Sequence, residues 1–158
     1  MAVYRTSSRF YALRDWQASG NALAYSGQPF TLKISGTQDL GQPTRPNQIC
    51  NGTLANRTLS QWFNPACYTI PVAGTFGTAG RNILEGPGSV ILNMAVGRVF
   101  ALPEKLGSLE LRLEGFNALN HPNFGYPSAT IGSSTTAGVI SSTTGNSRLV
   151  QISGRYSF

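Results

Sequence analysis

The chain has 158 residues, of which only 11% are charged, less than half of the roughly 25% found in ordinary soluble domains. Glycine and proline are frequent, with 18 and 9 copies, which excludes long uninterrupted helices. No segment approaches the roughly 18 consecutive apolar residues of a membrane helix. The composition therefore indicates a β-rich chain with long polar loops.

The formal net charge is +6, from twelve Lys and Arg residues against six Asp and Glu residues. Positive charge favours anionic partners such as nucleic acid or lipid phosphate, although a shortage of acidic residues produces the same balance. The arginines are scattered without a run of three, and no nucleic-acid-binding module accompanies them. We therefore expect no nucleic-acid partner.

Alternation of apolar and polar residues with a period of two predicts four strands. These are residues 16–25, 90–100, 108–117 and 148–158. Each has about the length that a tilted strand needs to cross a bilayer. The weakest alternation is in the first of them.

The predicted strand 108–117 has two faces of opposite character. One face carries Leu109, Leu111 and Leu113. The other carries Glu110, Arg112 and Glu114, and the last strand adds Gln151 and Arg155 with the same parity. Two such faces require two different solvents. In the strand before it, Arg98 breaks the apolar parity, and a position near lipid headgroups accounts for this exception.

The predicted connections alternate in length. A tight turn at 103–107 joins the second and third strands, whereas segments 33–88 and 118–146 are long. Outer-membrane barrels have short periplasmic turns and long extracellular loops. We therefore predict an all-β fold: an antiparallel meander of about four to six strands, forming a segment of a transmembrane outer-membrane β-barrel with long extracellular loops at 33–88 and 118–146.

A periplasmic C-terminus places both long loops outside the cell. The inner aromatic girdle then contains Trp16, Phe100, Tyr156 and Phe158. The opposite rim contains Tyr25, Phe30 and Phe116. The order of strands and loops is thus consistent with one barrel orientation.

Short motifs follow one another along the chain: WQASG at 16–20, SGQPFT at 26–31, WFN at 62–64, GTFGTAGRN at 74–82, LEGPG at 84–88, FNALNHPNF at 116–124 and QISGRYSF at 151–158. In this order they resemble the C-terminal end of the TonB-dependent receptor superfamily. The resemblance is to the Oar-like branch, whose members carry an N-terminal carboxypeptidase-regulatory-like domain.

The resemblance implies a plugged outer-membrane barrel of about 22 strands that imports a bulky solute with energy passed through TonB. We expect residues 1–158 to include no plug, TonB box, regulatory domain or signal peptide. Four strands cannot close a barrel. We therefore interpret residues 1–158 as the C-terminal part of such a barrel, a fragment in contact with outer-membrane lipid, and expect TonB to act only through the missing parts.

The C-terminus fits the signal read by the barrel-assembly machinery, which ends in an aromatic residue. Its matching residues are Gln151, Gly154, Tyr156 and Phe158. Ser153 stands where the signal prefers glycine, so Gly154 is one position late. The alternative is the last strand of a soluble β-protein.

The charged face allows two interpretations. Glu110, Arg112, Glu114 and Arg155 either line a lumen and contact plug or solute, or satisfy one another across strands, which we favour. Because no nucleophile or base accompanies the carboxylates, we expect no catalytic activity and no cofactor. The single histidine, His121, lies in a turn and predicts no metal site.

Cys50 and Cys67 are the two cysteines of the chain. Both lie in the loop predicted to be outside the cell, where no thiol-reducing system acts. An even count without metal partners favours a disulfide, and two free thiols in a flexible loop are the alternative. The bond would hold Trp62 and Phe63 near the barrel mouth, where we expect them to pack the loop rather than contact solute.

Two other classes of protein compete with the transporter. One is a soluble secreted β-sandwich that serves as an adhesion or binding module. The other is a barrel assembled from several chains, against which the long loops argue. The partner of the Leu109, Leu111 and Leu113 stripe separates the first class from the transporter: a second sheet in a sandwich, lipid in a barrel.

Overall fold

The computed structural model describes residues 2–7, 9–36, 44–103, 106–132 and 135–158. Within them the regular structure consists of β-strands and two short 3-10 helices, η1 (Tyr11–Leu13) and η2 (Pro65–Cys67). No helix in this part of the chain is long and apolar enough to cross a membrane. The chain forms two compact units, and each has its own architecture.

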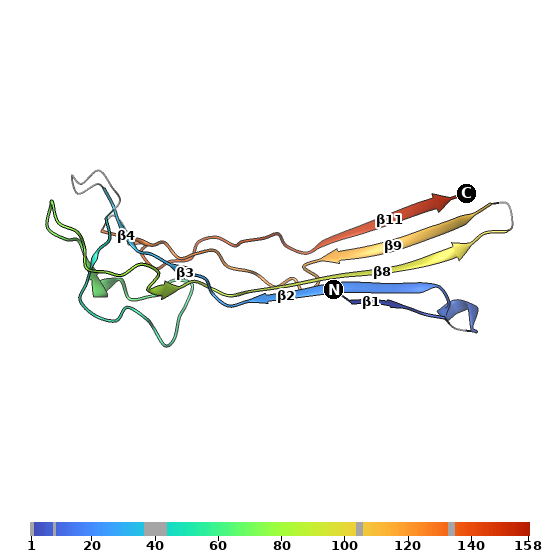
Figure 1. Cartoon of the computed structure of the whole chain (residues 1–158), viewed down its shortest axis with the longest axis horizontal. Coiled ribbons are helices and arrows are strands. Elements are labelled where there is room, and N and C mark those ends of the chain that lie inside the picture. The colour runs from blue at the N-terminus through green and yellow to red at the C-terminus, as the bar shows by residue number, and fades with distance from the viewer. Residues whose placement is uncertain (1, 8, 37–43, 104–105, 133–134) are drawn as a thin grey trace. The chain divides into compact units, whose positions relative to one another are not determined.

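The first unit consists of Met1–Tyr25, Val90–Pro122 and Gly145–Phe158. It contains one five-stranded sheet, and the strands are β1 (Ala2–Arg5), β2 (Trp16–Tyr25), β8 (Ser89–Ala101), β9 (Ser108–Phe116) and β11 (Leu149–Ser157). Their order in space follows their order in the chain, and neighbouring arrows alternate in direction (Figure 1). The predicted all-β antiparallel meander is thus confirmed.

Strand β1 has no counterpart among the four predicted strands. It pairs antiparallel with β2, from Ala2 opposite Gly20 to Arg5 opposite Gln17. A ladder-like hydrogen bond from the Thr6 backbone N–H to the Trp16 carbonyl (3.0 Å) extends the pair. Four residues are too few for alternation to be recognised, so the pairing comes from contact with β2.

The predicted hairpin between β8 and β9 is present. At its turn the Leu102 N–H donates to the Gly107 carbonyl (2.9 Å), and the Leu106 N–H donates to the Pro103 carbonyl (2.8 Å). Residues 104–105 of the predicted turn lie outside the described residues. Gly107 has a φ of 75°, and a Cβ there would lie 1.9 Å from the Ser157 carbonyl oxygen, so the position requires glycine.

Both short connections of the sheet, β1 to β2 and β8 to β9, lie at the same end of the first unit (Figure 1). The connections that leave β2 and β9 in the other direction are long, because the second unit is inserted there. Asn117, with a φ of 48°, ends β9 one residue earlier than predicted. Short and long connections are therefore separated as in outer-membrane barrels.

The second unit consists of Ser26–Ser89 and Asn123–Thr144. Its strands are two residues long and form three pairs: β3 (Pro29–Phe30) with β7 (Leu84–Glu85), β5 (Asn47–Gln48) with β6 (Tyr68–Thr69), and β4 (Lys33–Ile34) with β10 (Thr130–Ile131). The first two pairs are antiparallel and the third is parallel. Short strands of this kind hold a unit together only with a core between them.

The second unit has a hydrophobic core of its own, although its segments are predicted as loops. The buried members are Leu32, Ile34, Phe63, Cys67, Tyr68, Leu84 and Ile131. Phe30 packs against them, with its ring centroid 6.2 Å from that of Phe63 and 5.9 Å from that of Tyr126. The prediction of Phe30 at the outer aromatic rim is therefore wrong, because this ring is used in the core of the second unit.

Candidate functional site

The candidate site is the sheet of the first unit, whose register separates two faces. Leu113 of β9 lies opposite Val96 of β8 and Ile152 of β11. Directly opposed residues in antiparallel strands project to the same face. This row and the parallel rows on the same side of the sheet form the apolar face. Its apolar members are Met94, Val96, Phe100, Leu109, Leu111, Leu113, Val150, Ile152 and Tyr156.

The apolar face is exposed in the isolated chain. Ile152 is 78% exposed, Leu113 49% and Leu111 45%. Each fully buried aliphatic side chain contributes roughly 1.5–3 kcal/mol, so leaving a whole stripe in water is costly. Monomeric soluble proteins rarely carry such a continuous patch, which indicates that this face contacts an apolar medium or partner.

The opposite, polar face carries the charged residues predicted to line a lumen. The register puts Glu110, Arg112, Glu114, Gln151, Ser153 and Arg155 on it. Arg112 Nε pairs with Glu114 Oε1 at 2.8 Å. Gly97 and Ser153 lie opposite Arg112 on either side, and their small size leaves room for the guanidinium. Gln151 faces Glu114 and Arg155 faces Glu110, so charges and dipoles of opposite sign are paired in register.

A hollow of about 380 Å³ crosses β2, β8 and β9. Its polar lining includes Ser19, Asn21, Asn93, Arg112 and Glu114. Amide, hydroxyl and charged groups of this kind hydrogen-bond a polar molecule or water. Among the described residues, no group of three His, Cys, Asp or Glu side chains is placed to hold a metal ion.

The predicted outer aromatic rim is wrong for Phe116 as well. Phe116 lies opposite Leu149 and has the same parity as Glu114, so its ring belongs to the polar face. Alternation along β2 likewise puts Tyr25 on the side of Gln17, opposite to Trp16. The physical reason is that residues two positions apart in a strand point to the same face. Phe116 is two positions from Glu114 and therefore lies on the polar face with it.

The end of the sheet at the β8 to β9 turn carries members of the predicted aromatic group on the apolar face. Phe100 and Tyr156 both lie opposite Leu109, and the rings of Tyr156 and Phe158 are 5.8 Å apart. In the C-terminal signal, Gly154 lies opposite Leu111, with ordinary van der Waals room for a Cβ. Strand β11 occupies the edge of the sheet, so one side of its backbone has no partner strand within this sheet.

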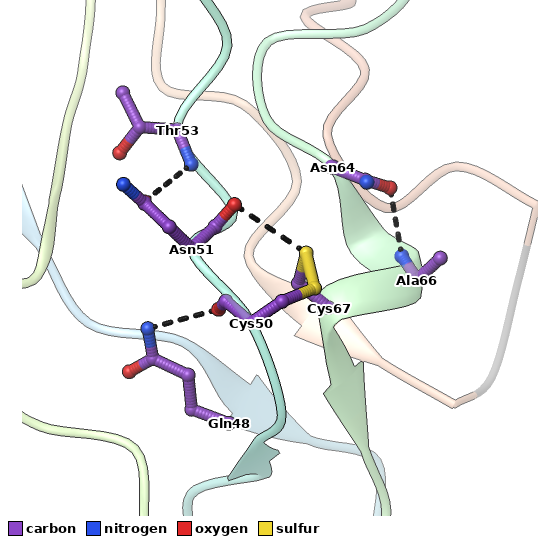
Figure 2. The surroundings of a disulfide bond; sticks show 7 residues. All are labelled: Gln48, Cys50, Asn51, Thr53, Asn64, Ala66 and Cys67. Carbon is purple, nitrogen blue, oxygen red and sulfur yellow. Dashed lines mark hydrogen bonds between the residues drawn. A yellow bond between two sulfur atoms is a disulfide. The ribbon is translucent and has the colours of Figure 1, made fainter.

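In the second unit, Cys50 and Cys67 form a disulfide with Cα atoms 4.8 Å apart, the pairing that the even cysteine count favours. Figure 2 shows Asn51, whose carbonyl oxygen lies 3.4 Å from the Cys67 Sγ, and Asn64, whose side chain accepts from the Ala66 N–H at the start of η2. The bond thus joins the segment that follows β5 to the capped 3-10 helix η2.

Trp62 and Phe63 pack the second unit, as expected. Phe63 is fully buried in the core, with its ring centroid 6.0 Å from that of Tyr68. Trp62 Nε1 donates to the Glu85 carbonyl (2.7 Å), and the Arg57 guanidinium lies 5.6 Å from the centre of its ring. The two aromatic residues therefore act in folding of this unit.

Tyr68 makes the stability of the second unit sensitive to alkaline pH. Burial raises the pKa of its hydroxyl above the ordinary value of 10.0, and a weaker hydrogen bond from Gly52 opposes the shift. Because the folded chain holds this proton more tightly than the unfolded chain, the stability is fully present below about pH 10 and is lost as the pH rises through the folded pKa. Burial thus sets an alkaline limit on this core.

We expect Tyr68→Phe to reduce that alkaline loss. The measurement is the denaturant midpoint of the second unit, followed by Trp62 fluorescence at about pH 8 and about pH 11, on either side of the tyrosine pKa. Tyr126→Phe is the control, since Tyr126 is 53% exposed. An unchanged alkaline loss in Tyr68→Phe would contradict the assignment.

A family model described as an outer membrane beta barrel domain matches residues 5–151. The chain belongs to this family. Nothing among curated proteins or solved structures matches it. As a member of the outer membrane beta barrel domain family, the protein is located in the outer membrane, and its open antiparallel sheet, with β1 and β11 at the edges, is a segment of barrel wall.

Proposed function

We propose that the chain is the C-terminal wall of a TonB-dependent receptor of the Oar-like branch, which takes up a bulky solute and has no catalytic activity of its own. The ordered motifs from WQASG at 16–20 to QISGRYSF at 151–158 support the branch. Membership of the outer membrane beta barrel domain family supports the location and the fold.

The two-faced sheet is the observation that carries the proposal. With the apolar face toward lipid and the polar face toward the lumen, both faces meet the solvent that they fit. The edges at β1 and β11 then pair with further strands of the same barrel, which satisfies their backbone groups in the membrane. In a soluble sandwich the apolar face needs a second sheet, and the other sheets among the described residues have strands of only two residues.

The polar face supplies the chemistry for contact with a solute or plug. The hollow across β2, β8 and β9 offers one arginine, one carboxylate and asparagine amides to a polar ligand. In this proposal the C-terminal residues Gln151, Gly154, Tyr156 and Phe158 are recognised by the barrel-assembly machinery. TonB acts through parts of the receptor other than residues 1–158.

The receptor role is tested by cross-linking in intact cells. The whole receptor that contains residues 1–158 is immunoprecipitated from outer membranes after formaldehyde treatment, with a porin of the same membrane as the control. We expect TonB to co-precipitate with the protein and not with the porin. Absence of TonB from a protein that is inserted in the outer membrane would contradict the receptor role and leave the barrel wall intact.

A further inference from the structure

Arg98 is the one residue of the β8 register that places a full positive charge on the apolar face. It lies opposite Leu111 of β9. Three aromatic rings surround its guanidinium carbon, with ring centres at 4.9 Å for Phe100, 5.0 Å for Tyr11 and 5.6 Å for Trp16. Such contacts stabilise a cation and hold the guanidinium in position.

The charge of Arg98 has no anionic partner in the described part of the chain. The ion pairs there join Arg14 to Asp15 and Arg112 to Glu114. Arg98 Nη2 donates to the Tyr11 carbonyl, which is neutral, and Nε is buried without a hydrogen-bond partner. A guanidinium on a lipid-facing surface is costly unless an anion neutralises it.

The position of Arg98 along the strand points to the anion. Phe100, two residues further along β8, belongs to the row with Leu109 and Tyr156, next to the short turn. Short turns lie on the periplasmic side of outer-membrane barrels, and aromatic girdles mark the headgroup level. Arg14 also lies at this end, 6.0 Å from the centre of the Tyr11 ring, but its charge is paired with Asp15.

We propose that Arg98, framed by Tyr11, Trp16 and Phe100, binds the phosphate of a phospholipid headgroup in the periplasmic leaflet. The proposal rests on the face orientation given under the proposed function. A guanidinium binds phosphate oxygens through paired N–H donors, and the rings contact the adjoining glycerol and upper acyl chain. The bound lipid supplies the counter-ion that Arg98 does not find among the described residues, and it anchors this end of the wall at the membrane surface.

Protection from chemical modification tests the site in the unaltered full chain. The protein, folded in dodecylmaltoside micelles, reacts with phenylglyoxal, and mass spectrometry gives the modification rate of each arginine. We expect phosphatidylglycerol to slow modification of Arg98 by about tenfold, as for a charge-assisted contact, and to leave Arg112 on the polar face unchanged. Diacylglycerol with the same acyl chains should give no protection.

Inorganic phosphate distinguishes the two sources of the anion. If inorganic phosphate at the same concentration protects Arg98 equally well, the site binds a free anion rather than a lipid headgroup, and the proposal is overturned. Lack of protection by phosphatidylglycerol would overturn it as well. Native mass spectrometry, which counts the lipids that stay bound, gives a second measure. Arg98→Gln should lose the bound phosphatidylglycerol, and Arg98→Lys should keep part of it. Arg155→Gln, on the polar face, should keep all of it.

A separate measurement shows whether the orientation itself fails. Tryptophan replaces Ile152 on the apolar face in one variant and Ser153 on the polar face in the other. Lipids with brominated acyl chains should quench the added fluorescence of Ile152→Trp and not that of Ser153→Trp. Reversed quenching would overturn the orientation and with it the lipid site, whereas correct quenching without protection of Arg98 would overturn the lipid site alone.

Discussion

Leu113→Arg is expected to lower the free energy of unfolding in a bilayer by about 2–4 kcal/mol, the cost of an arginine at the lipid-facing midplane of a barrel. Leu113 lies near the middle of β9, in a row with Val96 and Ile152, and is 49% exposed to the medium on the apolar face. The charge would have to leave the hydrocarbon or draw water into it. The measurement is denaturant unfolding of the protein in phosphatidylcholine bilayers.

Gln151→Arg is the matched control, because it adds the same side chain to the polar face. Gln151 lies opposite Glu114, so the new charge gains an acidic neighbour. We expect its unfolding midpoint to stay close to that of the wild type. A loss for Gln151→Arg as large as that for Leu113→Arg would show that the two faces do not meet different solvents.

Removing the disulfide by the double substitution Cys50→Ala and Cys67→Ala is expected to destabilise the second unit by about 3 kcal/mol on the chain-entropy model. The two cysteines are 17 positions apart, and Cys67 is buried in the core beside Phe63 and Tyr68. Hydrogen exchange reports the loss: amides of the second unit should lose protection by about a hundredfold, the equivalent of such a free-energy change.

Amides of β9 in the first unit serve as the internal control for this variant, since the disulfide lies wholly within the second unit. Protection that falls equally in both units would indicate general unfolding rather than loss of a local cross-link. Thiol titration of denatured, unreduced protein from the outer membrane checks the bond directly. Two free thiols would refute it.

The sheet of the first unit was predictable wherever a strand was long enough for its side chains to alternate. Within the nine residues of β9, Leu109, Leu111 and Leu113 mark the apolar face. A neighbouring strand with the same alternation must pair in a register that keeps its own apolar residues on that face, because a shift of one residue would move them all to the other side. The hairpin of β8 with β9, the shared face of Glu110 and Arg155, and the antiparallel meander all follow from this local property. The single possible pairing of two cysteines was equally accessible.

Contacts between residues distant in sequence decided the rest. Strand β1 is recognised only by its ladder with β2, and the core of the second unit joins Leu32, Phe63 and Ile131, which no local period relates. Phe30 was predicted at a membrane rim because its type suits a girdle, but burial against Phe63 decided its place. The sequence by itself therefore determined the two-faced wall, since a period of two is a local property of the backbone. Only the tertiary structure decided the core of the second unit and the aromatic rings around Arg98, because both depend on chain segments brought together by folding.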